Sequence, residues 1–269
     1  MVVVDTHCHA SLYWFEPVEV LLDEMTRNGV DKAALIQFRG VYDNSYLIEC
    51  MRRFPGRFSA VVIVDTQRPD APERLEEWVR QGAEGVRLSP TERSPGRDPL
   101  AIWRKAADLG ILVSSLGTLE EFASPGFETV IKTLSGLNII LEHLVGVGAY
   151  FGPGRRDPTI PYDTYKGVLG LARYPNTFVK VPGLGEICPR PTPFRQPFPF
   201  ENIPPLIEMA IDAFGPQRLM WGSDFPPVAN REGYRNALRF PMEQVKFKSG
   251  QDKEWIFGGT AATLFRFGG

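Results

Sequence analysis

The sequence alternates short apolar runs with longer amphipathic stretches, and this alternation constrains the fold more than any other feature. Seven apolar runs rich in β-branched residues each follow a Gly or Pro stop, and a run at the start of the chain makes eight. They cover residues 2–9, 32–38, 58–65, 85–88, 111–116, 138–143, 177–181 and 218–224. Apolar runs of this length between turn residues are typical of buried parallel strands, and their alternation with helices indicates βα units. Eight such units in 269 residues predict a single-domain (β/α)8 TIM barrel over residues 1–269.

The stretches between the runs begin at residues that often start helices. Pro17 precedes one amphipathic segment, Asp70 precedes a second, and Asp98-Pro99 precedes a third. Periodicity alone also allows a doubly wound open sheet. The first βα turn, however, is not a Gly-rich phosphate loop, which removes the usual dinucleotide-binding reason for such a sheet.

The charge and cysteine content argue against several kinds of partner. With 30 basic and 32 acidic side chains, nothing points to nucleic acid or to a membrane surface. No apolar run approaches the roughly 18 residues that span a bilayer, and no basic leader precedes the first strand. The three cysteines, Cys8, Cys50 and Cys188, are odd in number and scattered, so we expect a cytoplasmic protein without a disulfide framework.

Polar residues gather where the predicted strands end. In a βα barrel the carboxyl ends of the strands carry catalysis, and all three histidines of the sequence, His7, His9 and His143, fall there. The same rim holds Gln37, Arg39, Asp65, Arg87, Ser89, Ser114, Ser115, Glu142, Lys180, Ser223 and Asp224. This ring of polar side chains predicts an active site.

The first strand supplies half of a metal site. A strand alternates faces with a period of two, so Asp5, His7 and His9 should all project the same way. Histidine is the commonest metal ligand, and a His-x-His pair at a strand end converges without distortion of the backbone. At the sixth strand the same alternation should turn Glu142 away from His143 and into the packing layer.

Four segments together resemble one enzyme superfamily. They are DTHCH at 5–9, LEHL at 141–144, WGSDFP at 221–226 and IFGGTAATLF at 256–265, and in this order they resemble the amidohydrolase superfamily. The branch they resemble holds sugar lactonases, pyrone dicarboxylate lactonase and, more distantly, aminocarboxymuconate semialdehyde decarboxylase. The segments GVRL at 85–88 and FVKVPGL at 178–184 are similar to the lactonase members. The resemblance extends over essentially the whole chain.

The resemblance implies a set of ligands with two departures. His7 and His9 match the first-strand ligands, His143 the sixth-strand histidine and Asp224 the eighth-strand aspartate. Arg87 stands where dinuclear members carry a carboxylated lysine, and a guanidinium cannot bridge two cations. The fifth-strand histidine of mononuclear members is replaced by Ser114 or Ser115, which are poor ligands.

The remaining ligands are sufficient for one metal ion. His7, His9 and Asp224, with His143 as a further candidate, could hold one divalent cation, for which zinc is the natural choice, together with a water. Because some lactonases of this branch work without a metal, a metal-free site stays open.

The activity that the resemblance implies is the addition of water to a lactone or related ester carbonyl. Asp224 would act as general base and then as general acid. His7, His9 and any zinc would polarise the carbonyl and stabilise the oxyanion, and His143 and Arg87 would add hydrogen bonds. Two alternatives remain: a zinc-dependent non-oxidative decarboxylase, and a barrel that binds a small acid without turnover.

Basic residues on the rim and its loops predict a small anionic substrate, either carboxylated or a sugar acid. Arg39, Ser115 and Lys180 at strand ends, with Arg195 in the long 183–200 loop, are expected to bind it, because arginine pairs with carboxylates in a bidentate way. Long loops in compact barrels are usually functional. Further loop arginines are Arg93, Arg97, Arg155, Arg156 and Arg190. Loop arginines are also common on plain solvated surfaces, and the prolines and aromatics of the long loop could instead form a homodimer contact.

Overall fold

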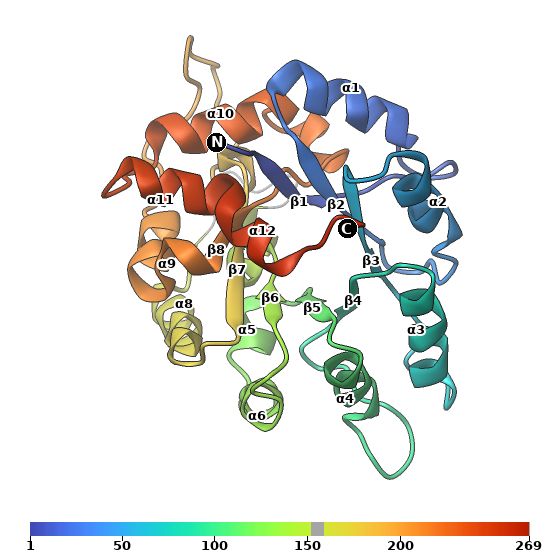
Figure 1. Cartoon of the computed structure of the whole chain (residues 1–269). Helices are drawn as coiled ribbons and strands as arrows, with labels where there is room; N and C mark the ends of the chain where they lie inside the picture. Colours follow the sequence, from blue (N-terminus) through green and yellow to red (C-terminus); the bar gives the residue numbers. More distant parts are fainter. Residues whose placement is uncertain (152–158, 269) are drawn as a thin grey trace.

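The computed structural model describes residues 1–151 and 159–268, so the predicted loop arginines Arg155 and Arg156 lie outside the described residues. Eight parallel strands follow one another around a barrel in sequence order (Figure 1). They are β1 (Val4–Cys8), β2 (Lys32–Ile36), β3 (Phe58–Val62), β4 (Gly85–Leu88), β5 (Leu112–Ser115), β6 (Ile139–Leu141), β7 (Thr177–Val181) and β8 (Leu219–Trp221). The predicted runs at 85–88 and 177–181 coincide with strands, while the others continue past the strand ends into the rim loops.

The barrel closes between its first and last strands. Cys8 forms a parallel bridge with Phe225, and hydrogen bonds join His9 N to Phe225 O at 2.7 Å and Asp224 N to His7 O at 2.8 Å. This closure confirms the predicted (β/α)8 barrel and excludes the doubly wound open sheet.

Helices surround the strands and begin close to the predicted start signals. The helix α1 follows Pro17 directly, α3 follows Asp70 directly, and α4 begins three residues after Asp98. The helices are α1 (Val18–Asn28), α2 (Ser45–Arg53), α3 (Ala71–Arg80), α4 (Ala101–Asp108), α5 (Leu119–Phe122), α6 (Pro125–Thr133), α7 (His143–Gly146), α8 (Tyr162–Leu169), α9 (Leu206–Phe214), α10 (Tyr234–Gln244), α11 (Gly250–Glu254) and α12 (Thr260–Leu264). None of the helices in the described ranges is long and apolar enough to cross a membrane.

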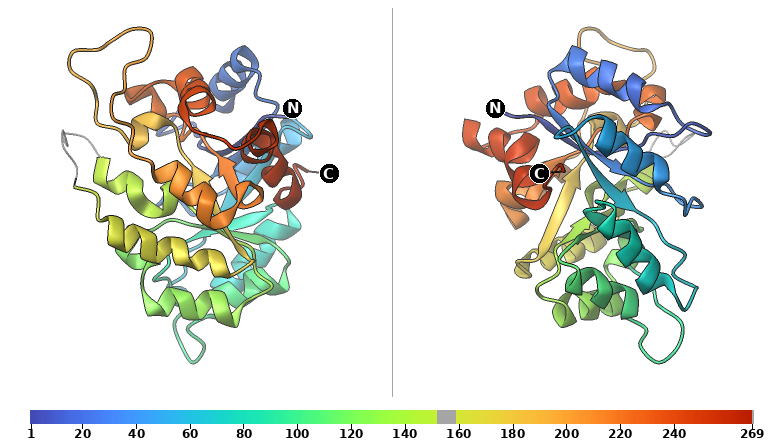
Figure 2. Two further views of the ribbon diagram at one scale, coloured as in Figure 1. Left: turned by 90° about the vertical axis from the view of Figure 1, so that its left-hand side faces the viewer. Right: turned by 45° about the vertical axis from the view of Figure 1, so that its right-hand side comes forward.

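The barrel interior divides into an apolar half and a polar half. In the half near the strand N-termini, buried apolar side chains form one cluster, made by Val4, Ala34, Ile36, Val61, Leu112, Ile140, Phe178 and Met220. Phe265 and Phe267, which follow α12, pack against this cluster and close that end of the barrel. Figure 2 places the C-terminus and the long loop after β7 at opposite ends of the molecule. The apolar plug therefore leaves the strand C-termini as the end that is open to ligands.

Candidate active site

The strand β1 carries His7 and His9 into the polar half of the barrel. Its pairing with β2 shifts register between Asp5 and Cys8, as at a β-bulge. Both histidines are buried and face the interior, but Asp5 does not join them, because its carboxylate accepts hydrogen bonds from the backbone N (2.9 Å) and Oγ (2.6 Å) of Ser223. The expectation that all three project together is wrong for Asp5, since strict alternation does not survive the register shift.

Asp224 reaches these histidines from the far end of the chain. A Cβ at Gly222 would lie 2.6 Å from the Cβ of His7, so only glycine lets β8 approach β1 this closely. Asp224 itself has a left-handed backbone, with φ 57°. Its Oδ1 lies 3.8 Å from Nε2 of His7 and 3.6 Å from Nε2 of His9. One carboxylate oxygen therefore faces both imidazoles across the seam where the barrel closes.

The third histidine joins the same group from β6. His143 starts a turn in which it, Leu144 and Val145 all have positive φ values, of 51°, 49° and 55°. Such a run is unfavourable for bulky side chains and is found where the surroundings enforce it, often at functional sites. The ring of His143 lies edge to face with that of His7, with 4.8 Å between the centroids. The structure thus brings together His7, His9, His143 and Asp224.

A buried ionic network lies below these four residues. Arg87 donates to both oxygens of Glu142, at 2.6 Å from Nη2 and 3.2 Å from Nε, and to the carbonyl of Gln37 at 3.1 Å. Ser114 Oγ donates to the same carboxylate at 2.6 Å, and Lys180 Nζ donates to Ser114 Oγ at 2.8 Å. The predicted outward orientation of Glu142 is wrong, because Glu142 keeps the inward direction of Ile140, and the left-handed turn at His143 then brings the next side chain to the same side.

The network holds its charges by mutual pairing. Burial opposes the ionisation of Glu142, but Arg87 and Lys180 outweigh it and lower the pKa of this carboxyl below its usual range. Burial lowers the pKa of Lys180 to about 8. Burial also lowers the pKa of His7 well below its usual value, and the neighbouring charge of Lys180 adds to this effect. His7 is therefore a neutral imidazole, which can bind a cation through one nitrogen or donate one hydrogen bond.

Two residues that the sequence interpretation missed surround the histidines and Asp224. Arg231, in the loop after β8, donates from Nη1 to Oδ2 of Asp224 at 3.0 Å. Glu186, in the loop after β7, accepts from Nδ1 of His143 at 2.7 Å. Both lie several residues beyond the ends of β7 and β8, where the side-chain alternation of a strand does not apply. In the sequence, only their charge and their position in loops of the catalytic side could have indicated a role.

These neighbours shift the pKa values of Asp224 and His143 in opposite directions. Burial opposes the charged form of Asp224, but the nearby ring of His9 and the charges of His143 and Arg231 lower its pKa to about 2. Burial likewise opposes the protonation of His143, but the carboxylate of Glu186 raises its pKa to about 9. At neutral pH the site therefore holds an ionised Asp224 beside a protonated His143.

Of the other predicted substrate-binding residues, some lie beside the histidines and others lie away from them. Lys180 is buried beside His7, with 3.0 Å between its Nζ and Nδ1 of His7. Ser115 points to the outer side of β5 with Val113, so Ser114 takes the inner position instead. Arg39 is exposed and donates to the carbonyl of Leu116. Arg195 is 69% exposed and pairs with Glu201, and the structure does not bring it to the histidines.

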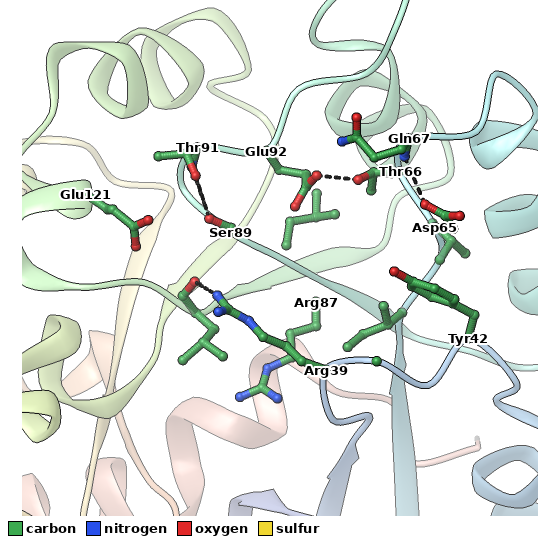
Figure 3. Close-up of a pocket in the computed structure, with 15 residues that line it drawn as sticks. Arg39, Tyr42, Asp65, Thr66, Gln67, Arg87, Ser89, Thr91, Glu92 and Glu121 are labelled. Atoms are coloured by element: carbon green, nitrogen blue, oxygen red, sulfur yellow. Dashed lines mark hydrogen bonds between the residues drawn. The ribbon is translucent and has the colours of Figure 1, made fainter. Parts of the chain in front are cut away.

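Two large cavities lined by described residues open on the catalytic end of the barrel. One, of about 440 Å³, lies over the ends of β2 to β5, and polar side chains including Arg39, Arg87 and Thr66 line it (Figure 3). The other, of about 640 Å³, lies over the ends of β6 to β8, and Glu186 and Arg231 line it. The long loop after β7 contributes Arg190, Phe194 and Phe200 to the second cavity.

His7, His9 and Asp224 fit one divalent cation. Their ligand atoms lie within 4.8 Å of one another, and Nε2 of His7 is buried with no hydrogen-bond partner among the described residues. His9 donates from Nδ1 to the carbonyl of Ile36 at 2.6 Å, which leaves its Nε2 free to bind a metal. Whether Nε2 of His7 can bind a metal depends on the charge of Lys180. An ammonium donates to Nδ1 and leaves the ring hydrogen on Nε2, whereas a neutral amine can accept the hydrogen of Nδ1 and so leaves Nε2 free. Arg87, which the sequence places where dinuclear members carry a bridging lysine, pairs with Glu142.

Fold and site together define a catalytic (β/α)8 barrel with its polar residues at the strand C-termini. Residues 4–267 match the sequence model of the amidohydrolase family. The chain therefore belongs to the amidohydrolase family and is a hydrolase enzyme, which confirms the resemblance inferred from the sequence and argues against a barrel that only binds its ligand.

Individual relatives are distant but cover the chain. L-Fucono-1,5-lactonase from Burkholderia ambifaria is 24% identical over 260 residues, which span 90% of this chain and 82% of the relative. An amidohydrolase from Burkholderia multivorans, solved with bound zinc, has a TM-score of 0.76 at 20% identity and covers 98% of this chain and 99% of its own. A Pseudomonas putida protein assigned as a 2-pyrone-4,6-dicarboxylic acid hydrolase has a TM-score of 0.74 at 22% identity, covering 99% of this chain and 98% of its own.

Proposed function

We propose that this enzyme hydrolyses a lactone, or a related ester, of a small carboxylated or sugar acid. The observation that carries the proposal is the position of Asp224, whose Oδ1 faces Nε2 of both His7 and His9 in the polar half of the barrel. Such a carboxylate can take a proton from water as the water attacks a carbonyl, and can then return it to the leaving oxygen. The relationship to a lactonase from Burkholderia ambifaria supports the same reaction class.

The roles of the other residues follow from their charge states. His143, with its pKa raised to about 9, supplies a protonated imidazole that can stabilise the oxyanion formed from the carbonyl oxygen. Arg87 is fully engaged with Glu142 and Gln37, so we assign it to holding the network under the site and not to direct contact with substrate. Arg39, exposed in the smaller cavity, is the better candidate for binding a substrate carboxylate.

A divalent cation, if bound, would be held by His7, His9 and Asp224, and would supply a more acidic water and a polarised carbonyl. The unpaired Nε2 of His7 supports this assignment when Lys180 is a neutral amine that accepts the Nδ1 hydrogen of His7. Zinc in the related Burkholderia multivorans structure makes zinc the first metal to test. Without a cation, His7 would instead donate from Nε2 to the carbonyl oxygen, with Lys180 donating to its Nδ1.

The decarboxylase alternative gains no support from the site. Ser114 occupies the inner position of β5, where a further metal ligand would be needed, and its hydroxyl donates to Glu142. A decarboxylase relies on a firmly held metal, and β5 adds no ligand here to His7, His9 and Asp224.

A direct test screens lactones by proton release at constant pH. The panel begins with L-fucono-1,5-lactone and 2-pyrone-4,6-dicarboxylate and extends to other aldonolactones. We expect hydrolysis of at least one compound to exceed the rate without enzyme by several orders of magnitude. Release of carbon dioxide from a carboxylated aromatic acid, with no lactone hydrolysed, would establish the decarboxylase instead.

Removal of metal should lower the activity. We expect about one zinc per chain in the purified protein, and loss of most lactonase activity after dialysis against a chelator, with recovery on addition of zinc. The metal content is measured by atomic emission on the samples used for the assay. Full activity in metal-free protein would assign His7 and His9 to hydrogen bonding alone.

The pH dependence should reflect the separated pKa values. Asp224 is ionised above about pH 2, so the ratio kcat/KM should be flat from weakly acidic to neutral pH. A histidine with a raised pKa is protonated below that value, so activity that needs the imidazolium of His143 should fall as the pH rises through about 9. The profile is measured after subtraction of spontaneous lactone hydrolysis. Activity that continues to rise above pH 9 would contradict a protonated His143.

A further inference from the structure

The loops after β7 and β8 interlock beside the active site. Glu232 Oε1 accepts a hydrogen bond from the backbone N of Gly185 at 3.0 Å. A Cβ at Gly185 would lie 1.8 Å from the other carboxylate oxygen of Glu232, so this approach requires glycine. The side chain of Glu232 is only 1% exposed. The contact therefore fixes the backbone that carries Glu186 against the segment that carries Arg231.

Glu186 and Arg231 extend from this interlock to the two groups expected to perform the chemistry. Nη2 of Arg231 lies 3.6 Å from Oε2 of Glu186, while its Nη1 donates to Oδ2 of Asp224 at 3.0 Å. The second oxygen of Glu186, Oε1, accepts from Nδ1 of His143 at 2.7 Å. The chain of contacts runs from Asp224 through Arg231 and Glu186 to His143. It joins the ends of β6 and β8 through side chains of two loops.

We infer that Glu186 and Arg231 are positioning residues, which deepens the proposed function and rests on it. Glu186 accepts the Nδ1 hydrogen of His143, so that Nε2 of the ring is directed to the substrate oxygen. Arg231 binds Oδ2 of Asp224, so that Oδ1 is directed to His7 and His9. Both His143 and Asp224 have left-handed backbones just beyond strand ends, so the alternation of a regular strand does not set the direction of their side chains. External partners are therefore needed to orient them.

Nitrogen NMR of the imidazole rings tests the role of Glu186 without any substrate. The sequence has three histidines, so the spectrum is simple to assign with one variant per histidine. We expect a hydrogen-bonded Nδ1 proton on His143 in the wild type. Glu186→Met should abolish it, Glu186→Gln should weaken it, and the signals of His7 and His9 should stay. Glu201→Gln, an exposed acid of the same loop, is the matched control. An unchanged His143 signal in Glu186→Met would overturn the inference.

A double-mutant cycle tests whether Glu186 acts through His143, using the lactone identified in the screen. Glu186→Met should lower kcat/KM by about 10- to 100-fold in the wild type, but by less than about 2-fold in the His143→Gln background. A purely structural role would give equal losses in both backgrounds, and that result would overturn the inference. If no lactone is hydrolysed, the proposed function fails, and the NMR result alone decides the position of Glu186.

For Arg231, the division of an effect between kcat and KM is the informative readout. Arg231→Met should lower kcat by about 10-fold or more and leave KM within about 2-fold, with partial recovery in Arg231→Lys. Arg239→Met, on α10, removes a partly buried arginine outside the site as the control. A raised KM with unchanged kcat would place Arg231 in substrate binding and overturn its positioning role.

Discussion

Asp224→Asn is expected to lower kcat/KM by about 10³-fold, near the middle of the range for loss of a general base. The amide cannot take a proton from water, and it cannot return one to the leaving oxygen. The single amide oxygen can still accept from Arg231, and the amide nitrogen then takes the place of Oδ1 opposite His7 and His9. Initial rates of the wild type and the variant with the best lactone of the screen measure the effect.

The asparagine variant should keep its fold, so a lower rate would not be due to unfolding. Asp224 has φ 57°, and asparagine is among the few residues that tolerate this left-handed conformation well. The midpoint of thermal unfolding should therefore change little. Asp43→Asn, an exposed aspartate in the loop after β2, is the matched control and should retain the wild-type rate. Near-wild-type turnover in Asp224→Asn would remove the proposed mechanism.

The fold could be predicted because each of its strands is marked by a local sequence pattern. Each strand needs only a few consecutive apolar residues and a turn preceding it, and these signals repeat eight times. The strands β4 and β7 match their predicted runs residue for residue. The closure of the barrel was harder to predict from local patterns, because it depends on the contact of β8 with β1. That contact in turn needs Gly222.

The site could be predicted in part, for a related reason. His7, His9 and Asp224 lie on or next to strands, where the period of two assigns each side chain to one face of the sheet from the residue order alone. The period fails where the backbone departs from a regular strand: at the register shift beside Asp5 and at the left-handed turn of His143. Strand patterns therefore indicated which residues meet but not how they are oriented.

The residues that the sequence did not reveal are those held by long-range side-chain contacts. Glu186 and Arg231 lie in loops without periodicity, and only the folded chain brings them within 3.6 Å of each other. The sequence placed Glu142 on the rim but did not reveal its pairing, because its partner Arg87 lies on a strand that is not adjacent to β6 in the sheet. Charge pairing across a barrel cannot be read from residue types alone, because many charged residues on the rim could pair in other ways.

Arg87→Met is expected to cost about 3 kcal/mol of the free energy of unfolding, at the lower end of the range for breaking a buried ion pair. The substitution keeps much of the side-chain volume but leaves Glu142, which is fully buried, without its main partner. The lower end applies because Lys180 at 3.7 Å and Ser114 at 2.6 Å still face the carboxylate. In a chain of this size the unfolding midpoint should fall by roughly 6–12 °C. Arg104→Met, which breaks an exposed pair with Asp98, should cost less than about 1 kcal/mol.

The pH dependence and a second substitution separate loss of charge pairing from loss of packing. A carboxyl whose folded pKa is lowered contributes stability above its unfolded pKa, near about 4.3, and this contribution is lost as the pH falls through the folded value. The gap between wild type and Arg87→Met should therefore be widest at neutral pH and should narrow below about pH 4. Adding Glu142→Gln to Arg87→Met removes the unpaired charge and should recover at least half of the lost stability, measured by urea unfolding. If the double variant is no more stable than Arg87→Met, the cost lies in packing, and the ion pair does not account for the stability of the polar half of the barrel.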